Sequence, residues 1–338
     1  MRLAIIAVGI AALLLFPVSG ASISYAAPPR LSLPLTCQPL ESCFIQNYVD
    51  VDPTPSVHDY TCHGASYDGH KGVDFRILSI AEMKKGVPVL SAAPGRVKAV
   101  RDGMTDRLII SADNRAAVLH RECGNGLLVM HDDGWQTQYC HMRKGTLRVK
   151  PGEIIQRGQI LGLIGLSGDT AFPHIHLAVR HRGRVIDPFT GLAPGEKACG
   201  QTGVSLWQPS ILKTFPYASG QPFVFGFADR RVNEADLMQW GRLPPPSSRL
   251  AQALVFYGMV LNLEKGDQLR IVLTGPDGRL VRRKTHPFNR HKASYLFFAG
   301  KKRKNNPWPA GTYQGSFSLL RGNSIIWTKL KKLVLTNK

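Results

Sequence analysis

Short apolar segments separated by glycine and turn residues run through most of the chain, and they constrain its fold more than any other feature. In the first two thirds of the chain they are rich in Val, Ile and Leu and have the length of single strands. These segments are residues 87–90, 95–101, 108–111, 126–131, 135–141, 159–164 and 174–180. Many short strands at this spacing indicate an antiparallel β domain.

A second strand-rich region follows a linker at residues 200–208. Its predicted strands are residues 254–263, 268–274, 295–298, 312–319 and 324–335, with one short helix at 235–240. The turns Pro276-Asp277-Gly278 and Arg321-Gly322-Asn323 fall between strands, where hairpins need such residues. A small Ig-like β-sandwich fits this pattern best. The whole chain is therefore expected to be mainly β, with more than one folded unit.

The first 26 residues have the pattern of a secretory signal peptide. Arg2 is followed by an apolar run at residues 3–16 and then by small and helix-breaking residues. Cleavage after Ala26 or after Ala21 would fit the small-residue rule. The apolar run is shorter than the roughly 18 residues that a membrane span needs. We therefore expect an exported protein, periplasmic or secreted.

All six cysteines lie beyond this signal segment. In an exported chain an even number of cysteines indicates disulfides, although six cysteines allow about fifteen pairings. The predicted strands at 126–131 and 135–142 flank a turn, which would bring Cys123 and Cys140 together. A bridge between Cys62 and Cys199 would clasp the ends of the first β region. The candidate pairs are then Cys123–Cys140, Cys62–Cys199 and Cys37–Cys43.

Positive charge is concentrated in the second region. Residues 1–200 carry 21 Lys and Arg against 17 Asp and Glu, whereas residues 201–338 carry 22 against 6. The basic clusters are Arg282-Arg283-Lys284 and Lys301-Lys302-Arg303-Lys304. Such a field attracts polyanions, which outside the cytoplasm are wall polymers, anionic lipid headgroups or lipopolysaccharide rather than nucleic acid. The alternative is a solvated surface that only aids solubility.

Four histidines and one aspartate have the spacing of a metal centre. They lie in the stretches His70-Lys71-Gly72-Val73-Asp74, Tyr139-Cys140-His141 and Pro173-His174-Ile175-His176. Residues two or four apart on a strand face the same side, so His70 can face with Asp74, and His174 with His176. Two imidazoles and one carboxylate form a typical set of three protein ligands for catalytic zinc. We assign these ligands to His70, Asp74 and His176.

Two histidines remain beside this expected zinc. Zinc lowers the pKa of a bound water from about 15.7 towards about 7 and polarises a carbonyl group. His141 and His174 can then share proton transfer and oxyanion stabilisation, and the spacing does not say which is the general base. Either motif alone occurs often by chance among core histidines. The combination is what favours a hydrolytic site.

The same stretches resemble a known family. In order, GHKGVDF, PVLSAAPGRV, YCHM, KPGEIIQRGQILGLIG and PHIHLAV resemble the hallmark segments of the lysostaphin-type (LytM-like) zinc peptidoglycan endopeptidases. The resemblance implies a β-sheet core of the duplicated hybrid motif kind, one zinc ion, and hydrolysis of peptide cross-links in bacterial peptidoglycan. It places the ligands at His70, Asp74 and His176 and the catalytic histidines at His141 and His174. Phe172 and Ala178 depart from the family, which commonly has glycine and an acidic residue there.

The predicted organisation follows from these observations. It is a signal peptide at 1–26, a Pro/Cys-rich strap at 27–66, a zinc peptidase domain at 67–200, and a basic Ig-like β-sandwich at 201–338. The expected partners are peptidoglycan stem peptides and an anionic wall or membrane surface. Two alternatives to a wall endopeptidase are a catalytically silent wall-binding regulator and an exported protease that acts on foreign proteins.

Overall fold

A computed structural model describes residues 27–201 and 203–337. The predicted signal peptide lies outside these residues. Within the described chain, no helix combines the length and the apolar character that a membrane crossing requires. The helices are α1 (Ile80–Lys85), α2 (Ala112–Ala116), α3 (Pro209–Thr214) and α4 (Glu234–Trp240), with a short 3-10 turn at Asp132–Gly134. The structure is mainly β, as expected.

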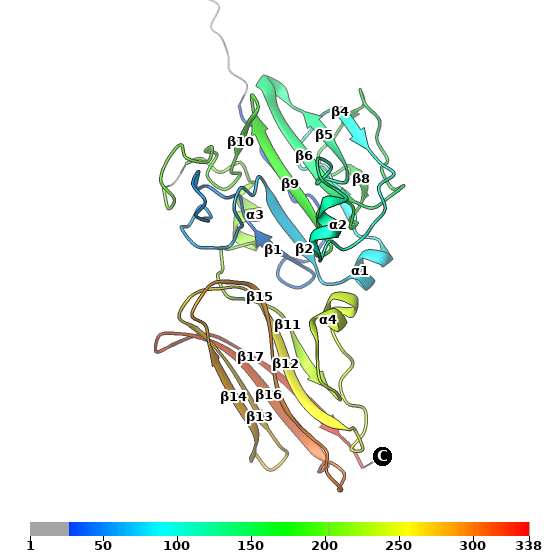
Figure 1. Ribbon diagram of the computed structural model, residues 1–338, viewed down its shortest axis with the longest axis vertical. Helices are drawn as coiled ribbons and strands as arrows, with labels where there is room; N and C mark the ends of the chain where they lie inside the picture. Colours follow the sequence, from blue (N-terminus) through cyan, green and yellow to red (C-terminus); the bar gives the residue numbers. More distant parts are fainter. Residues whose placement is uncertain (1–26, 202, 338) are drawn as a thin grey trace, which may run out of the picture.

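One large antiparallel sheet carries the first half of the described chain (Figure 1). Its strand order is β1-β2-β9-β6-β5-β4-β7. The short strand β10 pairs with residues 179–181 of β9, beyond the part of β9 that pairs with β2. These strands are β1 (Cys43–Asn47), β2 (Val73–Ile77), β4 (Gly95–Arg101), β5 (Asn125–Met130), β6 (Trp135–Met142), β7 (Ile154–Ile155), β9 (His174–His181) and β10 (Arg184–Ile186). A separate two-stranded sheet pairs β3 (Pro88–Leu90) with β8 (Ile160–Leu163).

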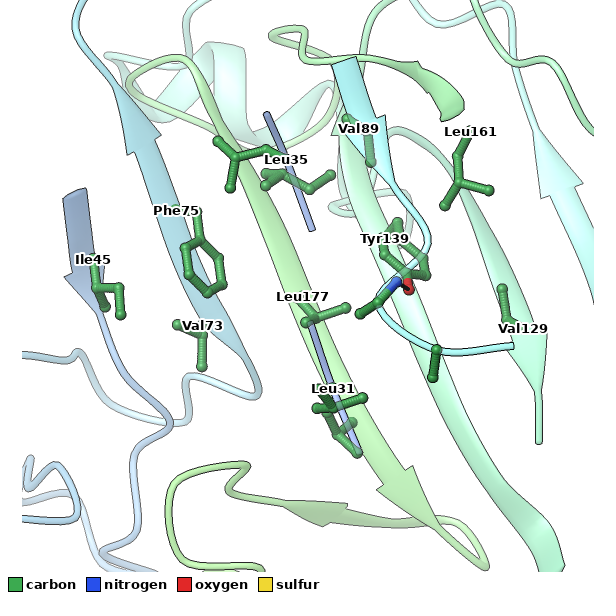
Figure 2. Packing of buried hydrophobic residues seen from close by; sticks show 14 of the residues in the cluster. Leu31, Leu35, Ile45, Val73, Phe75, Val89, Val129, Tyr139, Leu161 and Leu177 are labelled. Carbon is green, nitrogen blue, oxygen red and sulfur yellow. Dashed lines mark hydrogen bonds between the residues drawn. The ribbon is translucent and has the colours of Figure 1, made fainter. Parts of the chain in front are cut away.

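The large sheet has one apolar face, which follows from strand alternation in β2 and β9. Val73 and Phe75 are fully buried, and so are Ile175 and Leu177 opposite them. Figure 2 shows Val73, Phe75 and Leu177 on the side of the sheet where the strap residue Leu31 also packs. Since alternate residues point to opposite faces, the polar residues between them must share the other face.

Two further sheets form the C-terminal part. One has the order β11-β12-β15 and the other β14-β13-β16-β17. Their strands are β11 (Gln221–Ala228), β12 (Ala253–Leu263), β13 (Asp267–Thr274), β14 (Leu280–Pro287), β15 (Lys292–Lys302), β16 (Gly311–Arg321) and β17 (Ser324–Leu335). Phe256 of the first sheet and Ile271 and Phe317 of the second belong to one buried cluster, so the sheets pack face to face. Classification of this sandwich as Ig-like stays a prediction, as do the domain boundaries.

One expectation about local structure was wrong, and one strand of the strap was not predicted. Residues 108–111 do not form a strand, because the Ile109 amide bonds to the Thr170 carbonyl in an irregular loop and the Ser111 hydroxyl caps α2. The strap at residues 27–66 contains a strand that no pattern had indicated. This strand, β1, pairs antiparallel with β2 and forms the edge of the large sheet.

The cysteines form three disulfides, in the pairings Cys37–Cys43, Cys62–Cys199 and Cys123–Cys140. These are the candidate pairs of the sequence analysis. Cys123–Cys140 links the segment just before β5 to β6. Cys62–Cys199 ties the strap to the segment that follows β10.

Candidate metal centre and its cleft

The polar face of the large sheet carries the candidate ligands. In the pairing of β2 with β9, Asp74 lies opposite His176, and Arg76 lies opposite His174. All four therefore point away from the apolar core. Alternation places two of the predicted ligands on adjacent strands of one face.

His70 reaches the site from the turn before β2. The motif spacing predicts His70 on the same strand as Asp74, but β2 begins only at Val73. Its position is set instead by a hydrogen bond, in which His70 Nδ1 donates to the Tyr48 carbonyl at 2.7 Å. That bond directs Nε2 towards Asp74, with 3.2 Å between Nε2 and Oδ1.

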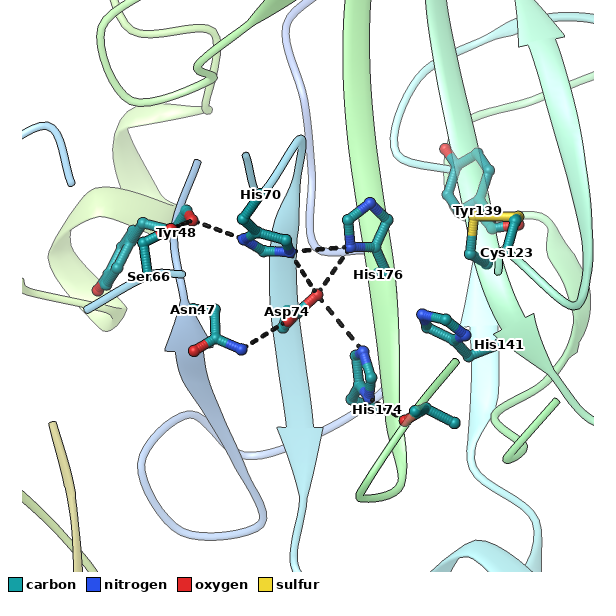
Figure 3. A network of polar contacts seen from close by, with 12 residues as sticks. Asn47, Tyr48, Ser66, His70, Asp74, Cys123, Tyr139, His141, His174 and His176 are labelled. Carbon is teal, nitrogen blue, oxygen red and sulfur yellow. Dashed lines mark hydrogen bonds and ion pairs between the residues drawn. A yellow bond between two sulfur atoms is a disulfide. The ribbon is translucent and has the colours of Figure 1, made fainter. Parts of the chain in front are cut away.

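Three donor atoms converge at one point (Figure 3). His176 Nδ1 lies 2.8 Å from Asp74 Oδ1 and 3.1 Å from His70 Nε2. Together with the 3.2 Å between His70 Nε2 and Asp74 Oδ1, these distances close a triangle with sides near 3 Å. Ligand atoms about 2.0–2.2 Å from a tetrahedral zinc ion are separated by a little more than 3 Å. The triangle therefore has the size that a zinc site requires.

The hydrogen bonds of His70 and Asp74 also leave one atom of each side chain available to a metal ion. Because His70 donates from Nδ1 to a carbonyl, its neutral form has a lone pair on Nε2. Asp74 uses Oδ2 to accept from Asn47 Nδ2 at 2.7 Å, so Oδ1 is the oxygen that faces the histidines. With the Nε2–H tautomer of His176, three lone pairs would meet at the triangle, and a cation would satisfy them together. Such outer hydrogen bonds on metal-binding histidines and carboxylates fix the tautomer and the orientation of the ligand.

Gly72 leaves room for His176. A Cβ at this position would lie 2.6 Å from His176 Nε2 and 2.7 Å from the Leu177 carbonyl oxygen. Any side chain here would push the imidazole or the neighbouring strand aside. This explains the glycine between His70 and Asp74 in the motif.

His174 and His141 stand beside the triangle. His174 Nε2 lies 3.4 Å from Asp74 Oδ1, while its Nδ1 lies 2.9 Å from the Phe172 carbonyl oxygen and 3.0 Å from Thr170 Oγ1. His141 Nδ1 donates to the Ser167 carbonyl at 2.8 Å. The two imidazole centroids are 4.7 Å apart. Both rings are thus held by their Nδ1 atoms, with Nε2 left for chemistry.

Burial and neighbouring charges set the protonation of these groups. Burial lowers the pKa of His141 well below its ordinary value, and the nearby His174 and His176 lower it further, so His141 is neutral at neutral pH. Burial alone would lower the pKa of His70, but the Asp74 carboxylate raises it overall. Burial alone would raise the pKa of Asp74, yet its histidine neighbours hold it well below the usual range. Asp74 is therefore ionised, and protons compete with a metal for His70.

A cleft of about 400 Å³ opens onto these groups. Asp74, His141 and His174 line its floor. Its walls include Tyr67, the ion pair between Arg115 and Asp169 (3.0 Å), the Phe172 loop, and Ala293 at the start of β15. One residue of the C-terminal sandwich, Ala293, therefore borders the cleft as well.

Two residues that hold this site escaped the sequence analysis. Asn47 ends β1 and Tyr48 follows it, and they bond to Asp74 and His70 across more than 20 residues of chain. An isolated Asn-Tyr pair in a proline-rich stretch carries no signal of this role. Only the position of β1 at the sheet edge reveals it.

Comparison with known proteins gives a family match and several similar proteins. Residues 68–188 match the family model described as Peptidase family M23. Peptidoglycan DD-endopeptidase ShyB of Vibrio cholerae is 30% identical over 129 residues, which are 38% of this chain and 24% of that protein. Peptidoglycan DD-endopeptidase ShyA of the same organism is 29% identical over 125 residues, 37% of this chain and 23% of that protein.

A solved structure gives a third comparison. The crystal structure of a zinc containing peptidase from Vibrio cholerae has 27% sequence identity and a TM-score of 0.27, and the match covers 43% of this chain and 39% of the other. This chain spans only about a quarter of the length of the two curated relatives.

Proposed function

Because this chain carries a domain of peptidase family M23 at residues 68–188, we propose that it is an exported zinc-dependent endopeptidase. Its substrate is bacterial peptidoglycan, in which it hydrolyses peptide cross-links. The two similar DD-endopeptidases support this choice of substrate. The signal-peptide pattern at residues 1–26 supports export.

The observation that carries the proposal is the triangle of donor atoms on His70, Asp74 and His176. Two imidazoles and one carboxylate leave the fourth position of a tetrahedral zinc ion open, which is typical of catalytic rather than structural sites. When bound, zinc supplies Lewis acidity, which lowers the pKa of water and polarises the scissile carbonyl. These three residues would hold it.

The remaining steps fall to side chains of this protein. His141 is neutral and buried, so its free Nε2 can accept a proton in the cleft. His174 has its Nδ1 beside the Phe172 carbonyl, so its Nε2 can donate to or accept from a reacting group. We assign proton transfer and stabilisation of negative charge to this pair without dividing the two roles between them.

Digestion of purified sacculi tests the proposal. Protein that lacks residues 1–26 should convert cross-linked muropeptides into uncrosslinked ones, and a chelator should abolish the reaction. His70→Ala should bind no zinc under conditions where the wild type binds one equivalent. Zinc-free wild-type protein that binds sacculi without cutting them would support a silent regulator instead. Cleavage of casein but not of sacculi would support a protease for foreign proteins.

We further propose that the C-terminal sandwich docks on an anionic wall or membrane surface. Arg282, Arg283 and Lys284 are exposed along β14, as are Lys301 and Lys302 at the end of β15 and Lys304 just after it. A cationic surface of this kind attracts polyanions over about one Debye length, roughly 8 Å at physiological ionic strength. Binding to anionic vesicles or sacculi should therefore fall steeply as salt increases, and binding that is unaffected by salt would rule out this mechanism.

A further inference from the structure

A buried arginine joins the polar face of the large sheet to the C-terminal sandwich. Arg76 lies on β2 two residues after Asp74 and is 3% exposed. Its guanidinium lies 4.7 Å from the ring centroid of Phe172 and 4.4 Å from that of Phe223. Phe172 belongs to the loop before β9, and Phe223 belongs to β11. The cation is thus held between a loop of the cleft and a strand of the sandwich.

The surroundings of Arg76 do not favour a charge for stability alone. Arg76 Nη1 donates to Gln46 Oε1 at 2.6 Å, but Nε has no hydrogen-bond partner among the described residues. Glu234 attracts the guanidinium of Arg76, but no carboxylate among the described residues forms an ion pair with it. Burial of a charge without such a pair is costly, and an apolar side chain of similar size would usually be more stable. The two aromatic faces offset part of this cost through cation–π attraction. A costly side chain beside the candidate site is therefore a candidate for a role there.

Phe172 carries the effect of Arg76 to His174. The ring centroids of Phe172 and His174 are 4.6 Å apart, and His174 Nδ1 lies 2.9 Å from the Phe172 carbonyl oxygen. A shift of Phe172 would therefore move both the ring contact and the hydrogen bond that orient His174. Phe223, Arg76, Phe172 and His174 form one continuous stack from β11 to the cleft.

A second connection runs through β1. Asn262 of β12 donates from Nδ2 to the Gln46 carbonyl at 2.7 Å, and Phe223 contacts the ring of Phe44 at 4.9 Å. The residue after Gln46 is Asn47, whose side chain holds Asp74. The sandwich therefore supports the strand that orients the candidate metal ligand.

We propose that the face of the sandwich formed by β11 and β12 is a positioning platform for the active site, and that Arg76 is its central positioning residue. The platform acts through Arg76 and Phe172 on His174, and through Asn262 and β1 on Asp74. This inference rests on the proposed function for the role of His174, but the connection to Asp74 concerns metal binding alone.

Substitution of Arg76 tests the first connection. With a soluble cross-linked muropeptide as substrate, Arg76→Met should lower kcat by about tenfold to hundredfold and change KM much less. Arg76→Lys keeps a cation between the rings and should recover part of the loss. The matched control is Arg180→Met, because Arg180 also donates to a glutamine, Gln138, at 2.7 Å but lies at the far end of β9. It should retain kcat within about twofold.

Should Arg76→Met fail to fold, Phe223→Leu removes the aromatic face while it keeps an apolar side chain, and the same fall in kcat is expected. Folded Arg76→Met or Phe223→Leu with the kcat of the wild type would overturn the proposal for His174. A loss shared equally by Arg180→Met would also overturn it, because the effect would then be general destabilisation.

Zinc affinity tests the second connection without any need for activity. Measured by competition with a chelator, Asn262→Ala should weaken zinc binding several-fold and Asn47→Leu by about tenfold to hundredfold. Asn233→Ala removes the cap of α4 in the same region and should leave affinity unchanged. Unchanged affinity in Asn262→Ala would overturn the connection through β1. Wild-type protein that binds zinc but cleaves no muropeptide would contradict the proposed function and leave this second test valid.

Discussion

Strands β2 and β12 are both buried along their full length, but they bury different kinds of side chain. β2 alternates Val73, Phe75 and Ile77 with Asp74 and Arg76, so the large sheet has an ionised polar face beneath its cleft. β12 buries apolar residues and glycine almost throughout, and the basic side chains on β14 and at the end of β15 lie on exposed positions. The first region carries a net charge of +4 and the second of +16.

The difference separates two uses of charge. A buried ionised group costs free energy unless its partners are placed with care, so a cluster of them marks a site of chemistry. Exposed lysines cost little and interact with distant charges, which suits association with a surface. Within one chain, we therefore expect reactivity at the buried polar face and long-range attraction at the exposed strands of the sandwich.

Removal of a buried carboxylate from each region gives the sharpest contrast. Asp74→Ala should lower kcat/KM on the order of 10⁴-fold, because a metal ligand is lost. Asp267, which pairs with Arg321 at 2.7 Å, should behave in the opposite way. Asp267→Ala should lower the free energy of unfolding by about 2–3 kcal/mol, because the buried carboxylate accepts two hydrogen bonds from Arg321 and one from the Glu264 amide, and the folded protein should remain active.

Activity assays and denaturant unfolding of both variants measure the contrast. Equal losses of activity in the two variants would break the comparison, since the sandwich would then carry chemistry as well.

Removal of a disulfide should destabilise the region that contains it more than the other region. Cys62–Cys199 closes 137 residues and lies entirely outside the sandwich, whereas Cys37–Cys43 closes only 6. In the chain-entropy model, loss of the long loop costs about 4–5 kcal/mol and loss of the short one about 2 kcal/mol. Replacement of Cys62 and Cys199 by serine should lower the thermal transition of the large sheet. Calorimetry should show little change in a separate transition of the sandwich, and a single transition shifted as a whole would mean that the regions unfold together.

Asp187, a buried carboxyl group outside the cleft, should make the stability of the first region depend on pH. Burial raises the pKa of Asp187 to about 6, with hydrogen bonds from Thr190 and Phe189 opposing and the nearby Asp59 adding to the rise. The folded protein therefore binds this proton more tightly than the unfolded chain does. Stability from the protonated group is complete below about pH 4 and is lost as the pH rises through 6.

The Asp187→Asn variant should not lose stability in this way as the pH rises. Between pH 4 and pH 7, the difference in free energy of unfolding should move in favour of the variant by about 2–3 kcal/mol. Denaturant titrations of both proteins at the two pH values give the number. A difference that is independent of pH would mean that Asp187 has an ordinary pKa.

The smallest effect is expected from the surface charges. Lys301→Gln together with Lys302→Gln should weaken binding to anionic vesicles by about tenfold at low salt, since each basic residue near such a surface contributes about 1 kcal/mol or less. Hydrolysis of a small soluble muropeptide should not change. A fall in that hydrolysis would show that the basic clusters act on the cleft rather than on docking.

Local patterns predicted much of the strand content. Residues 95–101 form β4 as expected, and the segments at 135–141 and 174–180 each lie within one strand that extends one residue further. Alternation and turn residues act over a few positions, so they can be recognised in sequence. The motif spacing likewise brought His70, Asp74, His174 and His176 to one place, with His141 beside them.

The supports of the site could not be predicted in this way. β1 is a short edge strand in a proline-rich stretch, and Asn47 acts on Asp74 only because β1 pairs with β2. The stack of Phe223, Arg76 and Phe172 joins three distant parts of the chain, and no periodic pattern connects them. Such contacts depend on tertiary packing, which single-sequence patterns do not encode.

The donor atoms come from distant parts of the chain, so they meet only after the chain has folded. Asp74 meets His176 across 102 residues, and contacts between such distant positions form slowly during folding. An incompletely folded chain therefore lacks the assembled triangle of donor atoms. If the chain crosses the membrane before it folds, the proposed hydrolytic activity would arise only at its destination, and the cell that makes it would need no separate inhibitor during transit.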